Sequence, residues 1–124
     1  MKEFCNEAYY LIFSTLANRT RLAIIDVLKD GRKSISEISA ALEQEENIIS
    51  HNLKPLEKSA VVLSEGSGKK KLYSLNREII APLSELLAFH VSKYCPGFKE
   101  CIPVEKLRKY MKAEAAKITY IEHE

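Results

Sequence analysis

The segment from Ser34 to Leu75 constrains the fold of this 124-residue chain more than any other. It begins with a capping box, in which Ser34 is the N-cap of a short helix and Glu37 occupies the third helical position. After a short turn, a second helix is expected over Glu46–Lys58. Two strands follow at Val61–Ser64 and Lys71–Leu75, and the glycines between them permit a tight turn. The segment therefore predicts helix, turn, helix and hairpin.

This order of elements predicts a winged helix-turn-helix, in which the second helix fits the major groove of DNA. Side chains placed about 100° apart divide the helix 46–58 into two faces. Ile49, Leu53 and Leu56 lie on the face expected to be buried. We predict that DNA is contacted by the opposite face of this helix, by the margin of that face and by the hairpin tip. The residues are Asn47, Ser50, His51, Lys54 and Lys58 in the helix, and Lys69, Lys70 and Lys71 in the hairpin.

Two features of the helix 46–58 complicate this interpretation. Glu43, Glu45 and Glu46 place negative charge at its front, which suits the helix dipole but repels phosphate. Pro55 lies inside the expected helix and removes a backbone hydrogen bond, so either the helix bends there or its bounds differ. A solvated face without function, or a winged helix that binds another protein instead of DNA, is therefore the alternative interpretation.

Helical periodicity also predicts helices on both sides of this segment. The first is expected over Lys2–Ala17, with one apolar face. The second should begin with Thr20 as its N-cap, end before Gly31 and bury Leu22, Ile25 and Leu28. Helical spacing returns over Arg77–Tyr94, and Pro103 suits the first turn of a last helix.

Composition and motifs exclude several classes of protein. No apolar run approaches the roughly 20 residues needed to cross a bilayer, so we expect a cytoplasmic protein with no membrane partner. A phosphate-binding glycine loop, an HExxH motif and a nucleophile elbow are all missing, so we expect neither an enzyme nor a small organic substrate. The net charge of +2 supports nucleic-acid binding only weakly, and the lysines at the hairpin tip matter more.

Three motifs of the chain resemble those of ArsR/SmtB-type winged-helix repressors. The segment 13–22 (FSTLANRTRL) resembles their opening signature, 49–58 (ISHNLKPLEK) their recognition helix and 70–75 (KKLYSL) their second wing strand. The resemblance implies a homodimeric transcriptional regulator, usually a repressor that leaves its operator when an inducer binds. It also implies that the first helix and the helix 77–94 form the dimer interface.

The fold expected from these observations is mainly α. One winged helix-turn-helix domain over residues 1–95 includes a two-stranded β-hairpin wing and the dimerising N-terminal and post-wing helices. A C-terminal extension over residues 96–124 adds one further helix. The expected partners are double-stranded DNA and a second copy of the chain.

The metal ligands that this resemblance implies are largely replaced in this chain. Founding members of the family bind thiophilic ions through a Cys-x-Cys pair, and the matching positions here are Ser34 and Ser36. Hydroxyls are poor ligands for such ions. Zinc-responsive members use an Asp-x-His pair and a later histidine. His90 matches the first histidine, but Ala88 replaces the aspartate, and Cys101 stands at the offset of the second histidine beyond a Pro-Gly break.

The three cysteines suggest a different kind of sensor. Cys95 and Cys101 flank a Pro-Gly turn, and Cys5 lies on the first helix, which packs on the dimerising helix in the family fold. Such thiolates can bind a thiophilic metal or metalloid ion, or two of them can form a redox disulfide. Alternatively, Cys5 is a core residue, and Cys95 and Cys101 form a structural bridge or stay as thiols. Both interpretations remain open, and no other cofactor is predicted.

Overall fold

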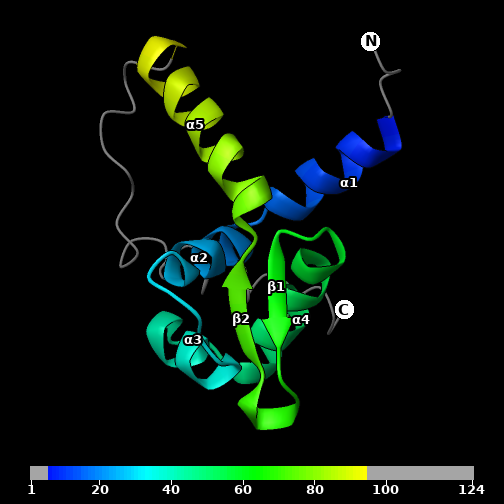
Figure 1. Cartoon of the computed structure of the whole chain (residues 1–124), viewed down its shortest axis with the longest axis vertical. Coiled ribbons are helices and arrows are strands. Elements are labelled where there is room, and N and C mark those ends of the chain that lie inside the picture. The colour runs from blue at the N-terminus through cyan, green and yellow to red at the C-terminus, as the bar shows by residue number, and fades with distance from the viewer. Residues whose placement is uncertain (1–5, 95–124) are drawn as a thin grey trace, which may run out of the picture. The chain divides into compact units, whose positions relative to one another are not determined.

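The computed structural model describes residues 6–94, which are mainly helical (Figure 1). This part of the chain divides into two compact units between Leu75 and Asn76. The expected C-terminal helix and the extension 96–124 lie outside the described residues. The elements in chain order are α1 (Asn6–Leu16), α2 (Arg19–Leu28), α3 (Ile35–Leu42), α4 (Glu46–Lys58), β1 (Val62–Glu65), a 3-10 turn (Gly68–Lys70), β2 (Leu72–Leu75) and α5 (Arg77–Tyr94).

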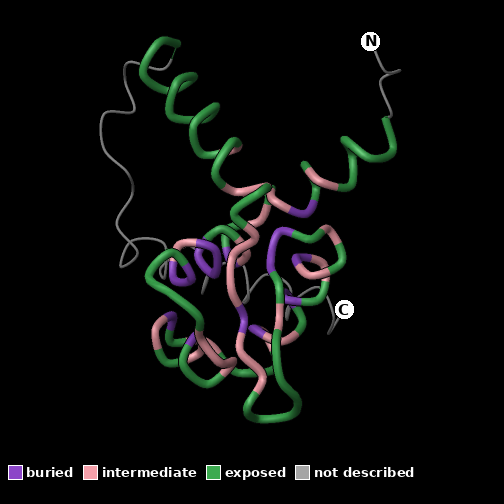
Figure 2. Tube along the Cα trace, in the orientation of Figure 1, coloured by how far each residue is buried: buried purple, intermediate pink, exposed green. Residues whose placement is uncertain are grey.

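The core of the first unit lies where α2, α3, α4 and the hairpin meet, and Figure 2 shows the buried residues concentrated there. Fully burying a side chain of this kind stabilises the fold by about 1.5–3 kcal/mol. The helices and the hairpin therefore depend on one another for stability. The largest fully buried side chains are Ile24, Ile38, Leu42, Ile49, Leu53, Leu56, Val61 and Val62.

The beginning of α2 differs from the sequence prediction. Asn18, and not Thr20, is the N-cap, because the side chain of Asn18 accepts a hydrogen bond from the backbone N–H of Arg21 at 3.0 Å. Asparagine is at least as good an N-cap as threonine, and the helix therefore begins earlier. The predicted apolar stripe is wrong at Leu22, which is 48% exposed, whereas Ile25 and Leu28 are buried as expected.

Side-chain hydrogen bonds hold both the start of α3 and the turn that joins α3 to α4. The predicted capping box is confirmed: Ser34 Oγ accepts from the N–H of Glu37 at 3.2 Å, and the Glu37 carboxylate accepts from the N–H of Ser34 at 3.2 Å. Helix α3 ends at Leu42, and its C-cap, Glu43, adopts a left-handed conformation with φ of 55°. Ser39 Oγ donates a hydrogen bond to the carbonyl of Gln44. The capping box therefore fixes the start of α3, and the bond between Ser39 and Gln44 fixes the turn that leads into α4.

The hairpin of β1 and β2, together with its tip, forms the wing. The strands are antiparallel, with Val62 opposite Leu75. Both begin one residue later than predicted. The N–H of Val61 still donates to the carbonyl of Leu56 in α4, and the N–H of Lys71 closes the 3-10 turn on the carbonyl of Gly68. The backbone N–H groups of Val61 and Lys71 are therefore not available for the hydrogen bonds between β1 and β2.

A backbone bridge that the sequence did not predict attaches the wing to the segment before α3. The N–H of Tyr73 donates to the carbonyl of Lys33 at 2.8 Å, and the N–H of Lys33 donates to the carbonyl of Tyr73 at 3.0 Å. Because β2 thus has partners on both sides, the wing is joined to the helix-turn-helix by the main chain itself.

Helix α5 has the bounds expected from the sequence, and none of its residues is buried within the described chain. Figure 2 shows most of α5 and much of α1 as exposed. No helix between residues 6 and 94 combines the length and the apolar character needed to cross a membrane. The large exposed apolar side chains of the two helices are Tyr9, Tyr10, Leu11 and Phe13 on α1, and Leu86, Leu87, Phe89, Val91 and Tyr94 on α5.

A polar network fixes α4 against α1 and α2. Asn52, only 9% exposed, lies on the inner side of α4, and its Oδ1 accepts from Arg21 Nε at 3.2 Å. Its amide nitrogen donates to the carbonyl of Ile48 at 2.9 Å. Arg21 Nη1 also donates to the carbonyl of Thr15, near the end of α1, at 3.3 Å. One guanidinium group therefore joins three helices.

We predict that Asn52→Ala lowers the free energy of unfolding by about 1.5–3 kcal/mol, because it removes the acceptor of a charged donor. Urea unfolding followed by circular dichroism measures this change. In a double-mutant cycle with Arg21→Ala, the two losses should be non-additive by about 0.5 kcal/mol or more. The matched control is Asn47→Ala on the exposed face of the same helix, with an expected change below about 0.5 kcal/mol. Strictly additive losses would show that Arg21 and Asn52 act independently.

Candidate nucleic-acid interface

The outer face of α4 is exposed as the sequence predicts. On the inner face, Ile49, Leu53 and Leu56 are at most 1% exposed. The outer side chains follow the spacing i, i+4, i+7 and i+11, so they form one polar stripe along the helix. Amide, imidazole and ammonium groups in such a stripe can meet base edges and phosphates. The exposed residues are Asn47, His51, Lys54 and Lys58, with Ser50 half-buried at the margin.

Pro55 does not shorten α4. It lies close to the C-terminal end, so the backbone hydrogen bond that it removes is the one to His51 within the last turns. Beyond it, the N–H and the hydroxyl of Ser59 both donate to the Pro55 carbonyl, at 3.1 and 2.9 Å. The helix continues to Lys58, so the bounds expected from the sequence are confirmed.

The acidic residues before and at the start of α4 lie on the surface. Glu45 is the N-cap and makes no side-chain capping bond. Glu46 Oε1 accepts a hydrogen bond from Ser36 Oγ at 2.8 Å, which directs this carboxylate towards α3. The front of α4 is therefore negative, whereas Lys54 and Lys58 make its rear positive. Phosphate contacts are expected at the rear of the helix and at the wing.

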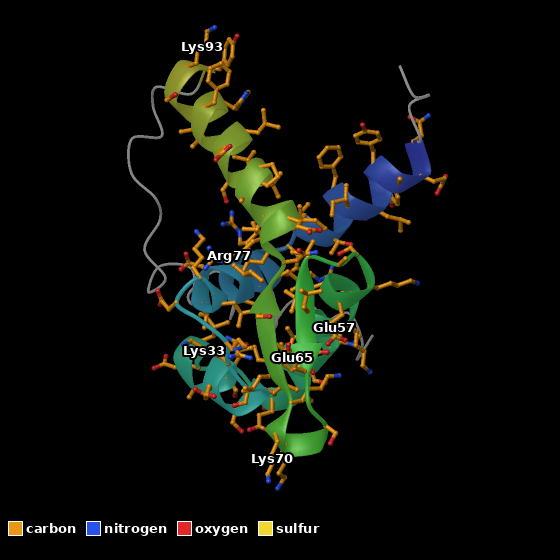
Figure 3. The ribbon with its side chains drawn as sticks, in the orientation of Figure 1. Lys33, Glu57, Glu65, Lys70, Arg77 and Lys93 are labelled. Atoms are coloured by element: carbon orange, nitrogen blue, oxygen red, sulfur yellow. The ribbon has the colours of Figure 1, made fainter. Side chains whose placement is uncertain are left out.

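The three consecutive lysines of the wing do not share one environment. Lys69 and Lys70 are exposed in the 3-10 turn, and Figure 3 shows Lys70 extending away from the tip. Lys71 is half-buried, with its Nζ 3.7 Å from Glu57 Oε1 and 5.5 Å from the centre of the Tyr73 ring. Only the first two lysines present their charge freely to solvent.

The shape of the wing tip depends on Gly66. Its φ is +93°, and a Cβ atom built there would lie 2.9 Å from the carbonyl oxygen of Lys70. A side chain would thus be strained by the backbone angle and would also press on the 3-10 turn. At the base of the tip, Arg32 Nη1 pairs with Glu65 Oε2 at 3.2 Å on the surface.

The structure describes only some of the residues that the sequence suggested for a sensor site. Cys5, Cys95 and Cys101 lie outside the described residues. Between residues 6 and 94, no group of three His, Cys, Asp or Glu side chains is arranged to hold a metal ion. His90 is exposed on α5, and its ring centre lies 5.5 Å from that of Tyr94.

Sequence reasoning missed three residues that position the interface, namely Lys33, Asn52 and Glu57. A signal existed for Asn52, because it falls on the same side of the helix as Ile49 and Leu56. A polar side chain at such a position needs a buried partner. No local pattern marks the bridge of Lys33 to Tyr73 or the pairing of Glu57 with Lys71, because the partners are distant in sequence.

Comparison with known proteins agrees with this geometry. The family model described as "Methanogenesis regulatory protein FilR1, N-terminal domain" matches residues 12–90, which include the C-terminal part of α1, all elements from α2 to β2 and most of α5. The HTH-type transcriptional regulator NmtR of Mycobacterium tuberculosis is 28% identical over 75 residues. That match covers 60% of this chain and 62% of NmtR, so the chain spans less than two thirds of this relative.

Solved structures show the same fold. One of them is a domain from Mycobacterium bovis, with a TM-score of 0.63 and 21% identity. It is described as a homodimeric winged helix-turn-helix DNA-binding domain of a possible ArsR-family regulator. The match covers 82% of this chain and all of that domain. HlyU from Vibrio cholerae has a TM-score of 0.60 and 26% identity, over 76% of this chain and 99% of HlyU.

The family match, the relative and the shared fold agree with the motifs in 13–22, 49–58 and 70–75. The chain therefore belongs to the family of the FilR1 N-terminal domain, and it is similar in its motifs and in its winged helix-turn-helix fold to ArsR-type transcriptional regulators.

Proposed function

We propose that this chain binds double-stranded DNA sequence-specifically as a homodimer and represses transcription. The observation that supports this function best is the exposed polar stripe of α4, whose inner side is fully packed. A helix held in this way can enter the major groove without rearranging, while the exposed lysines of the wing meet the phosphate backbone. The M. bovis domain of the same fold is itself described as DNA-binding.

The exposed apolar faces of α1 and α5 support the homodimer. On α1, the rings of Tyr9 and Phe13 lie 6.1 Å apart and are both exposed. On α5, Leu86 and Leu87 are exposed although they belong to an apolar stripe. Exposed apolar faces of this kind mark interaction surfaces. A second copy of the chain is the proposed partner, because two-fold dimers are the commonest soluble oligomers and match palindromic half-sites.

We predict salt-dependent, sequence-selective binding to the chain's own promoter region. Fluorescence anisotropy with a promoter duplex and a scrambled duplex of equal composition, between about 50 and 200 mM salt, measures both properties. The logarithm of the binding constant should fall linearly with the logarithm of the salt concentration, and saturation should occur at two protomers per site. Equal affinity for the two duplexes at every salt concentration would reject the proposal.

The acidic front of α4 favours a second candidate, a winged helix that binds another protein. Glu43, Glu45 and Glu46 are exposed near the expected groove-facing end and repel phosphate. The same anisotropy experiment, combined with a pull-down, separates the two functions. One stable protein partner together with no binding to either duplex would select this alternative.

His51 and Lys70 should have separable roles in DNA binding. We predict that His51→Ala lowers affinity for the promoter site by about 1–3 kcal/mol and leaves affinity for the scrambled duplex nearly unchanged, because it removes a base contact. Lys70→Ala should weaken binding to both duplexes alike, because a phosphate contact carries no sequence information. Anisotropy titrations with both duplexes give the four affinities. Equal losses on the two duplexes for both variants would contradict this division.

We infer that a thiol-reactive signal relieves repression through Cys95 and Cys101, with Cys5 as an optional third group. The support is compositional, since Ser34 and Ser36 replace the cysteine pair of the founding members. The signal is either oxidation of two thiols to a disulfide or binding of a thiophilic metalloid.

Addition of diamide or arsenite to the wild-type protein should lower DNA affinity by about 5- to 150-fold, a typical coupling between two sites. Cys95→Ser together with Cys101→Ser should abolish this response, whereas Cys5→Ser alone serves as the control. Thiol counting with and without reductant, and metal analysis, accompany the titrations. Three free thiols, no bound metal and an unchanged affinity would remove this sensor.

A further inference from the structure

Glu57 of α4 and Lys71 of the wing contact each other, and contacts to DNA bases or phosphates do not require this pair. The Lys71 Nζ lies 3.7 Å from Glu57 Oε1, and the two side chains are 35% and 30% exposed. That carboxylate oxygen is shielded from solvent and has no hydrogen-bond partner among the described residues. A shielded carboxylate oxygen of this kind is costly unless a positive charge lies beside it. The nearby ammonium group supplies that charge.

Lys71 is held on the inner side of the wing by more than one neighbour. Its Nζ lies over the ring of Tyr73, which is buried and is itself fixed by the backbone bridge to Lys33. Lys69 and Lys70, in contrast, are exposed and make no ion pair within residues 6–94. Figure 3 shows Glu57 beside the hairpin and Lys70 at the far tip. The structure thus separates one wing lysine from the other two.

We propose that Lys71 is a positioning residue that clamps the wing to α4 through Glu57, while Lys69 and Lys70 supply the phosphate contacts of the wing. The DNA-binding part of this inference rests on the proposed function. A lysine that binds phosphate releases counterions from DNA, and each such contact steepens the salt dependence by about 0.9. A lysine already neutralised by a carboxylate contributes little to that release. In this proposal each wing therefore contributes two phosphate-binding charges, those of Lys69 and Lys70, and not three.

The salt dependence of DNA binding distinguishes a clamp from a phosphate contact. Lys71→Met and its matched control Lys70→Met both keep the aliphatic stem and remove one charge. Lys70→Met should reduce the slope of log affinity against log salt by about 0.9 per protomer. Lys71→Met should keep the wild-type slope and weaken binding by about twofold to fivefold, the range for a partly exposed ion pair. In a Glu57→Gln background, Lys71→Met should cause no further loss.

A measurement without DNA tests the clamp separately. Residual dipolar couplings of the backbone amides report the orientation of the wing relative to α4 in the free protein. Glu57→Gln and Lys71→Met should change the dipolar couplings of the wing in the same way. The double variant should show the same couplings as either single variant. Lys70→Met should retain the wild-type couplings. If the wild-type protein binds no DNA, the proposed function fails and these couplings alone decide the clamp.

Two outcomes would overturn the inference. A slope that falls as much for Lys71→Met as for Lys70→Met would make Lys71 a phosphate contact. Wild-type dipolar couplings in both Glu57→Gln and Lys71→Met would show that the pair does not position the wing.

Discussion

The burial of one side of α4 is the constraint on which the rest of this structure depends. Ile49, Leu53 and Leu56 are removed from water, and Asn52 is bound on the same side by the Arg21 guanidinium. Apolar burial supplies most of the stability, whereas the hydrogen bond selects one orientation of the helix, because it is directional. A helix fixed on its inner side leaves its outer side chains free to meet a ligand at defined positions.

The wing is attached to the helix-turn-helix by three different kinds of contact. The bridge of Lys33 to Tyr73 uses only backbone atoms, the Arg32–Glu65 ion pair lies on the surface, and the Glu57–Lys71 pair lies partly out of solvent. Backbone pairing joins β2 to the segment before α3, and in the proposed clamp the Glu57–Lys71 pair positions the wing relative to α4. Recognition elements held by a packed scaffold keep their geometry better than elements on free loops.

Local patterns in the sequence predicted the helices well where periodicity and capping agree. The capping box of Ser34 and the bounds of α4 and α5 follow from such signals. Asn18 and Thr20 are both competent N-caps a few residues apart, so local chemistry alone did not choose between them.

The candidate interface was predictable only in part. The inner and outer faces of α4 follow from helical spacing, and the DNA contacts assigned to its outer residues stay predictions. Consecutive lysines look equivalent in a sequence. A 3-10 turn that ends at Lys70 separates them, since it places Lys71 at the start of the extended segment that faces α4. Contacts between distant segments, such as Glu57 with Lys71, leave no periodic signal to find.

Helix α5 makes the stability of the proposed dimer depend on the concentration of the protein. It has 18 residues and buries none of them within the described chain, whereas most of the stability of a helix in a protein comes from packing of its apolar face. In the proposed dimer, association supplies the missing burial, so the free energy of folding includes a concentration term. Dilution then removes both the partner and part of the fold. A cell that makes few copies of such a regulator would hold a smaller fraction in the DNA-binding form, so expression level alone would tune occupancy of its sites.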